Sequence, residues 1–138
     1  MRDILFRGKA INRDRGEYRT DYKNGDWVYG LLMKKYDERF ENLPAEMSNE
    51  DGVTGIEVDY KTIGEYTGLT DTSGKKIFEG DIVVNDLSQM RDALSNKPHV
   101  VKFINGRWNY ICDEGRKVKI IGNIYDNLEL LKMDGGQL

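Results

Sequence analysis

Residues 63–84 read IGEYTGLTDTSGKKIFEGDIVV, and this segment constrains the fold more than any other part of the chain. Two apolar runs are separated by a polar turn, and a second short turn at residues 79–81 leads into a β-branched run. Asp71 can accept hydrogen bonds from nearby backbone N–H groups, and Gly74 can adopt the positive φ that a tight turn requires. This signature segment predicts a β-hairpin followed by a further strand.

Short apolar segments joined by turn residues recur along the rest of the chain. The dipeptides at residues 24–25 and 105–106 are both Asn-Gly, which favours tight hairpin turns. Residues 36–52 are acidic and contain a proline and a glycine, so they predict a loop. Residues 85–98 interrupt the β pattern and predict a short helix, and the run Leu-Glu-Leu-Leu at 128–131 predicts a terminal helical turn.

These patterns predict a mainly β (α+β) fold. We expect short antiparallel strands in a barrel-like or SH3-like arrangement, with one or two short helices. The length of 138 residues suits a single domain. Within it, residues 1–52 would form N-terminal β-hairpins and residues 53–138 a C-terminal SH3-like β barrel.

Charge is unevenly distributed along the chain. The net charge of −3 argues against a nucleic-acid footprint over the whole protein, which is normally basic. The first 23 residues are nevertheless rich in cations, whereas residues 37–51 are mainly acidic. A small basic face therefore stays open beside the simpler interpretation of two solvated surfaces of opposite sign. The cations of the first segment are Arg2, Arg7, Lys9, Arg13, Arg15, Arg19 and Lys23.

Cysteine and histidine are scarce, since Cys112 and His99 are the only residues of each type. No intrachain disulfide can form, and a zinc site would need about four such ligands. We expect no metal and no cofactor. No apolar run approaches the roughly 18–20 residues of a membrane span, and the start lacks the features of a signal peptide. The expected location is the cytoplasm, without a membrane partner.

Three groups of residues invite a chemical interpretation. The sequence from Gly68 to Lys76 resembles a phosphate-binding loop, but its spacing is wrong and no helix follows. Asp71 and Ser73 suggest a calcium loop, but the remaining ligand spacing is absent. The carboxylates Glu65, Glu79 and Asp81 could serve a hydrolase, although Gly80 makes turn chemistry the simpler explanation. A Cys112–His99 nucleophile pair would lack a third orienting group.

Aromatic residues are the remaining candidates for a site. They could form a surface that stacks on bases or binds a peptide, or they could pack in the core and pair across strands. The five candidates for a binding surface are Trp27, Tyr29, Tyr66, Phe78 and Trp108.

Several segments together resemble the YopX family of phage and prophage proteins. The central match is IGEYTGL at 63–69 with GKKIFEGDIV at 74–83, and ILFRGK at 4–9, WVYG at 27–30 and IGNIYDNLELL at 121–131 also match. The acidic stretch 37–52 and the insert 85–98 have no counterpart. The resemblance implies a small protein carried by temperate phages, and it implies no catalytic residues because the family carries no established activity.

The expected function is therefore binding rather than catalysis. The leading hypothesis is a phage or prophage accessory protein that binds a host or phage macromolecule. One alternative is nucleic-acid binding through residues 1–23 and the aromatic hairpins, and another is a carboxylate-dependent hydrolase. A homo-oligomer is a separate possibility, because exposed strand edges can pair between chains.

Overall fold

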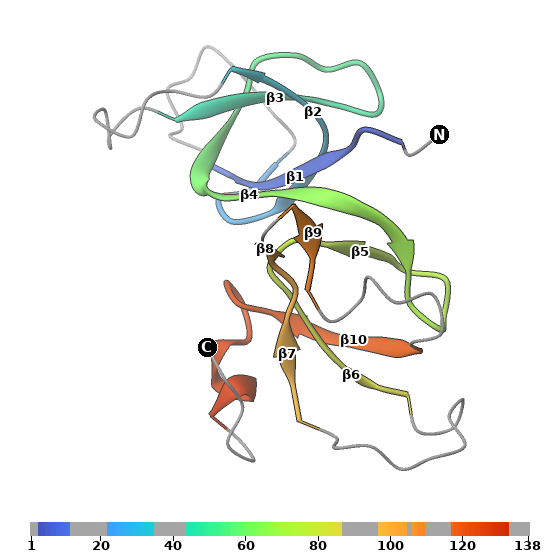
Figure 1. Ribbon diagram of the computed structural model, residues 1–138. Coiled ribbons are helices and arrows are strands. Elements are labelled where there is room, and N and C mark those ends of the chain that lie inside the picture. The colour runs from blue at the N-terminus through green and yellow to red at the C-terminus, as the bar shows by residue number, and fades with distance from the viewer. Residues whose placement is uncertain are drawn as a thin grey trace. The chain divides into compact units, whose positions relative to one another are not determined.

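The computed structural model describes residues 3–11, 22–34, 44–86, 97–104, 106–109 and 117–132. Figure 1 shows the elements in these ranges, all of them strands except one short turn of 3-10 helix near the C-terminus. The strands pair antiparallel throughout, so the predicted mainly β, antiparallel fold is confirmed. In chain order the strands are β1 Phe6–Ala10, β2 Trp27–Lys34, β3 Ala45–Asn49, β4 Ile56–Thr70, β5 Lys76–Phe78, β6 Asp81–Asn85, β7 His99–Val100, β8 Phe103–Ile104, β9 Arg107–Trp108 and β10 Val118–Asn123.

The chain divides into two compact units, Asp3–Glu65 and Tyr66–Leu138. The division falls inside β4, whereas the sequence placed a boundary between residues 52 and 53. The physical reason lies in the pairing of β4. The residues of β4 up to Glu65 pair with β3 and β1 and belong with them, whereas Tyr66 pairs with Phe78 of β5.

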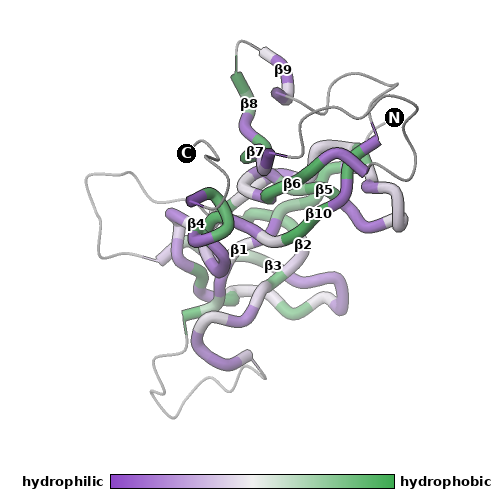
Figure 2. The backbone as a smooth tube through the Cα atoms, turned by 90° about the horizontal axis from the view of Figure 1, so that it is seen from below, coloured by the Kyte–Doolittle hydropathy of each residue, from purple (hydrophilic) through white to green (hydrophobic). Residues whose placement is uncertain are grey.

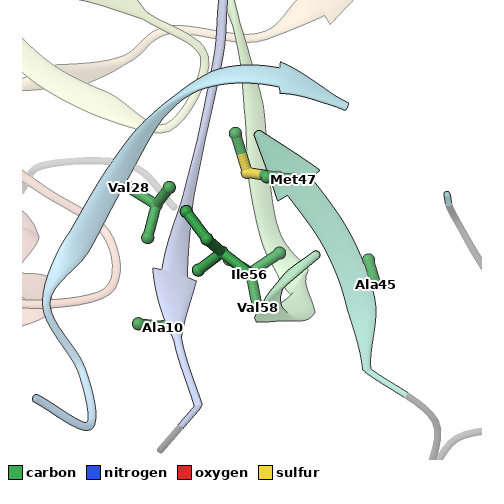
Figure 3. Packing of buried hydrophobic residues seen from close by; sticks show 6 residues of the cluster. All are labelled: Ala10, Val28, Ala45, Met47, Ile56 and Val58. Carbon is green, nitrogen blue, oxygen red and sulfur yellow. The ribbon is translucent and has the colours of Figure 1, made fainter. Parts of the chain in front are cut away.

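In the N-terminal unit, four strands pair in a closed circuit. β1 pairs with β2, β2 with β3, β3 with β4, and β4 again with β1. Figure 3 shows the side chains that this circuit encloses. Burial of each large apolar side chain stabilises the fold by about 1.5–3 kcal/mol. The buried cluster consists of Ala10, Val28, Ala45, Met47, Ile56 and Val58.

The prediction of a loop over residues 36–52 is wrong for its last part, because Ala45–Asn49 form β3. Ala45 and Met47 are fully buried, and Glu46 and Ser48, which alternate with them, lie on the opposite face of the strand. Ala45 and Met47 are separated by one polar residue, and this pattern is too short to predict a strand in an acidic segment. Residues 35–43 lie outside the described part of the chain.

In the C-terminal unit, β6 is the central strand of the sheet β10–β6–β7. Alternating side chains of β6 enter two different clusters. Val83 packs with Ile77, Val101, Trp108 and Val118, whereas Ile82 packs with Val100 and Leu131. Figure 2 shows the apolar runs of β6 and β10 in green. Because both faces of β6 are covered, this strand reads as a continuous apolar run in the sequence.

The described residues contain no α-helix, so the expectation of one or two short helices is not met there. The predicted terminal turn is a 3-10 helix, Leu128–Leu131, which buries Leu131. Asn127 precedes it, but its side chain does not cap it. The Asn127 carboxamide oxygen instead accepts a hydrogen bond from the Asn123 N–H at 3.3 Å. Most of the predicted helix at 85–98 lies outside the described residues, and Asn85 belongs to β6.

Gly30 provides a test of the packing between β2 and β3. A Cβ at this position would lie 1.7 Å from the backbone oxygen of Ser48, so the strands must separate in a Gly30→Ala variant. We expect a loss of about 3 kcal/mol or more in the free energy of unfolding, measured by urea denaturation. The control is Leu31→Ala at the next residue, which is exposed and should change the value by no more than about 0.5 kcal/mol. Equal effects of the two variants would contradict the close approach.

Candidate binding surface

The first turn of the signature segment is organised by one carboxylate. Asp71 Oδ1 accepts hydrogen bonds from the Ser73 N–H at 2.9 Å, the Ser73 hydroxyl at 2.8 Å and the Lys75 N–H at 2.9 Å. Asp71 Oδ2 accepts a fourth from the Ile120 N–H at 3.1 Å, which attaches the turn to β10. Gly74 closes the turn with a φ of +85°. The predicted Asx-turn is confirmed.

This environment changes the acidity of Asp71. Burial alone raises the pKa of the carboxyl group, but the hydrogen bonds from Ile120, Ser73 and Lys75 favour the ionised form and outweigh it. The net result is a pKa below the ordinary 3.8. Both oxygens already serve protein donors, so the turn holds its carboxylate for structure. The phosphate-loop and calcium-loop interpretations are not supported by this geometry.

The second turn, residues 79–81, is used in the same way. Gly80 has a φ of +91°, its N–H donates to the Val101 oxygen, and its own oxygen accepts from the Ile124 N–H. Asp81 is almost fully buried, and its Oδ2 accepts a hydrogen bond from the Phe78 N–H at 2.8 Å. A carboxylate fixed on a turn amide is poorly placed to activate water or hold magnesium. This contact removes the main argument for a carboxylate-dependent hydrolase.

Other potential ligands do not gather in the described ranges. Glu65 ends the N-terminal unit, whereas Glu79 and Asp81 belong to the C-terminal unit. Within residues 3–11, 22–34, 44–86, 97–104, 106–109 and 117–132, no three His, Cys, Asp or Glu residues group as metal ligands would. His99 opens β7 opposite Val83, and Cys112 lies outside the described part of the chain.

The five candidate aromatic residues have different surroundings. Tyr66, Phe78 and Trp108 are all less than a tenth exposed and belong to the C-terminal unit. The rings of Tyr66 and Phe78 are 5.7 Å apart, and Trp108 packs edge-on against Phe103 at 5.0 Å. These three serve the core of that unit. Trp27 and Tyr29 lie on β2 in the N-terminal unit and keep access to solvent.

Trp27 and Tyr29 begin a row of large residues along one face of β2. Val28 and Leu32 contact the buried cluster, so the residues that alternate with them point to the opposite face. Tyr29 is 39% exposed, and two apolar residues that the sequence analysis missed, Leu31 and Met33, are 53% and 55% exposed. We call Trp27, Tyr29, Leu31 and Met33 the β2 row. The alternation in WVYGLLM was the signal that could have revealed it.

Two cations of β1 flank the first half of the β2 row. In the register of the two strands, Lys9 lies opposite Trp27 and Arg7 opposite Tyr29. The Arg7 guanidinium carbon lies 4.5 Å from the centre of the Trp27 ring, and the Lys9 amino group lies 5.3 Å from it. Cations at these distances are attracted to the ring face. Of the basic residues predicted to form a face, these two and the exposed Lys23 are described.

One carboxylate of β3 lies beside the end of the row, on its other side. Glu46 of β3 lies between the buried Ala45 and Met47, so it shares the outward face. Glu57 of β4 is directly opposite Glu46 in the strand register. The register also places Glu46 beside Lys34, at the far end of β2 from Trp27. The cations of β1 therefore lie beside the start of β2, whereas Glu46 lies beside its end.

This geometry defines a small antiparallel β protein with an apolar, charge-flanked face on its N-terminal unit. The chain matches the family described as YopX protein over residues 17–132, and it therefore belongs to the YopX family. Comparison with curated proteins gives no match.

A solved structure supports the fold. The chain is similar to the crystal structure of protein EF1440 from Enterococcus faecalis, with a TM-score of 0.52 and 22% sequence identity. The similarity covers 95% of this chain and 99% of that one, so it extends over both units. At this identity the likeness concerns the fold alone. Among the described residues, helices with the length and apolarity needed to cross a membrane are absent.

The Asp71 carboxylate gives a test of the signature turn. In an Asp71→Asn variant, an NH₂ group replaces one carboxylate oxygen. This group would face N–H or O–H donors that in the wild-type protein donate to an oxygen. We expect a loss of about 3 kcal/mol in the free energy of unfolding at neutral pH. The control is Glu129→Gln, which removes an exposed carboxylate of the same unit and should change stability by about 0.5 kcal/mol at most. A neutral effect of Asp71→Asn would contradict the assigned role.

The same variant tests the pH dependence. Because the pKa of Asp71 is lowered in the folded state, its ionised form stabilises the protein at pH values above 3.8. This contribution is lost as the pH falls below that value and the folded carboxylate takes up its proton. The wild-type protein should therefore lose more stability on acidification than Asp71→Asn, as measured by urea denaturation at a series of acidic pH values.

Proposed function

We propose that this chain is a non-catalytic accessory protein of phages and prophages that binds a host or phage macromolecule in the bacterial cytoplasm. The observation that carries the proposal is the β2 row, whose apolar side chains are exposed together on one strand. Contiguous exposed apolar residues with a polar rim are typical of interaction sites. The charged residues of β1 and β3, the two neighbours of β2, supply that rim.

The signature segment supports binding rather than catalysis. Its two acidic turn residues, Asp71 and Asp81, accept hydrogen bonds from backbone N–H groups of their own unit. Their chemistry is directed at holding strands together. The outward face of β2, in contrast, carries side chains that the core does not require. A binding protein uses such a rigid face, because a fixed surface loses little conformational entropy when a partner docks.

For the architecture, we propose a single YopX-like domain that consists of two subdomains. The closed circuit of pairings supports a barrel-like N-terminal part. The short antiparallel strands β5, β6, β7 and β10, together with the 3-10 turn that buries Leu131, support an SH3-like C-terminal part. This architecture holds the binding face but does not identify its partner, because one fold can serve many functions.

A site-specific photo-crosslinker tests the proposed function. A benzophenone amino acid placed at Leu31 should give a defined crosslinked product in phage-infected bacterial cells, because the partner covers the β2 row. The control is the same amino acid at Val53, which is 46% exposed in the turn between β3 and β4 of the same unit. Products of the same identity and yield at both positions, or none at Leu31, would overturn the proposal.

Nucleic-acid binding is a second candidate, favoured by the stacking of Arg7 and Lys9 on Trp27. Proteins that bind single strands combine aromatic platforms with cations. The test measures quenching of tryptophan fluorescence by an oligonucleotide of single-stranded DNA at several salt concentrations. Lys9→Ala should weaken binding and reduce the slope of log affinity against log salt by about 0.7.

The control for this test is Lys102→Ala, which removes an exposed cation from the C-terminal unit. Arg7 is unsuitable for substitution, because its side chain is nearly buried and its loss would disturb folding. An absence of binding at low salt would rule out this second candidate.

A further inference from the structure

The second half of β2 has an edge that no strand covers within the described residues. The strand extends over Trp27–Lys34, but β1 pairs with it only from Trp27 to Gly30. On its other side, β3 pairs with it from Gly30 to Lys34. We propose that an extended segment of a partner protein pairs with the open edge, beyond the end of β1, and adds a strand beside Leu31 and Leu32.

The chain itself leaves this edge at Phe6. In the register of the two strands Phe6 lies opposite Gly30, so Ile4 would lie opposite Leu32 if β1 continued toward the N-terminus. Residues 3–5 are described, however, and they belong to no strand. The side chain of Ile4 is 68% exposed. Among the described residues, nothing takes the position beside Leu32 that a longer β1 would fill.

The backbone groups of Leu32 are directed toward this position. The Ala10 N–H donates to the Asp26 oxygen at 2.8 Å, so Asp26 points its carbonyl group at β1. Along an antiparallel strand the backbone groups alternate between the two neighbours, and the register of β1 with β2 shows no shift. The groups of Gly30 therefore face Phe6, and those of Leu32 face the place beyond it. An added strand can accept from the Leu32 N–H and donate to the Leu32 oxygen.

Apolar side chains surround the open edge. Leu31 and Met33 lie on the outward face of β2, and Ile4 is exposed where the chain departs from the edge. Leu32 packs against the buried cluster and fixes the strand from the inner side. Side chains of an added strand alternate between the two faces, so every second one would lie on the same face as Leu31. Extended peptides bind sheet edges by this combination of backbone pairing and side-chain contact.

The backbone groups decide the class of partner. A donor and an acceptor on one residue of a strand edge match the same two groups of another extended polypeptide. A nucleic acid has no such repeating pair, and Leu31 and Met33 offer neither cations for phosphates nor rings for bases. An apolar helix would cover the side chains but would leave the edge unpaired, because its own backbone groups are bonded within the helix.

The open edge is short. The register between β2 and β3 shifts between Leu32 and Lys34, so β2 has a bulge at Met33 and its regular part ends there. We therefore expect backbone pairing over only a few residues, with the apolar side chains supplying further contact. A bulge and a lysine at the end of an edge also discourage indiscriminate pairing, which suits a specific partner.

Hydrogen exchange of the backbone amides, followed by NMR on the full-length protein, tests the open edge. The Val28 N–H faces Gly8 of β1 and should be protected, whereas the Leu32 N–H should exchange about tenfold faster or more. The Leu31 N–H faces β3 and is a second protected control. Protection of the Leu32 N–H equal to that of Val28 would overturn the proposal, because another segment would then already cover the edge.

A fused strand tests whether an extended segment binds there. A segment of alternating valine and threonine is joined to the N-terminus of the full chain through a flexible glycine-serine linker, which gives it a high effective concentration. The matched control has proline at alternate positions, which removes backbone donors. The Leu32 N–H should be protected about tenfold more in the first fusion than in the second. Equal protection in both fusions would contradict strand addition.

Strand addition at Leu32 rests on the proposed function, because it names the class of partner that the β2 row binds, but the two can fail separately. A crosslink from Leu31 to a defined host or phage protein, in a chain whose Leu32 N–H is already protected, overturns strand addition and leaves the proposed function standing. A fused strand that protects Leu32, without any crosslink from Leu31 in infected cells, supports strand addition and overturns the wider function. A crosslink to a second copy or to nucleic acid overturns the choice of partner.

Discussion

The arrangement of the C-terminal unit depends on the carboxylate of Asp71. It accepts three hydrogen bonds inside its own turn and a fourth from Ile120, 49 residues later in the chain. The adjacent Thr72 N–H donates to the Val118 oxygen, so the turn is attached to β10 at two points. A local turn motif thereby fixes a long-range strand position. The second turn repeats the device, since Gly80 bonds both Val101 and Ile124.

Local chemistry of this kind is what the sequence reveals well. The turns at Gly74 and Gly80 follow from residue types that tolerate positive φ, and the β6 strand follows from its apolar run. Long-range pairing is harder to predict. The strand β4 is continuous over Ile56–Thr70, because its residues up to Glu65 pair with β3 and β1 and its last residues pair with β5.

The candidate surface could be predicted only in part, for a related reason. Alternation along a strand shows which residues share a face but does not show which face is buried. Trp27 and Trp108 both stand beside polar residues in hairpins that look alike in the sequence. Trp27 nevertheless lies on an outward face, whereas Trp108 is buried. The choice depends on where the neighbouring strands place the core. Val28 enters the cluster with Met47 and Val58, and this contact turns Trp27 outward.

The residues that stabilise the fold and the residues that are candidates for binding are therefore different. Side chains of the signature segment are explained by the contacts that they make within the fold. Leu31 and Met33 are not, because exposed strand positions gain little stability from apolar residues and polar ones would serve as well. Gly30, between Tyr29 and Leu31, holds β2 against β3 so closely that the row has little freedom to collapse. A rigid strand that keeps neighbouring apolar side chains in solvent presents a surface that a binding partner can cover.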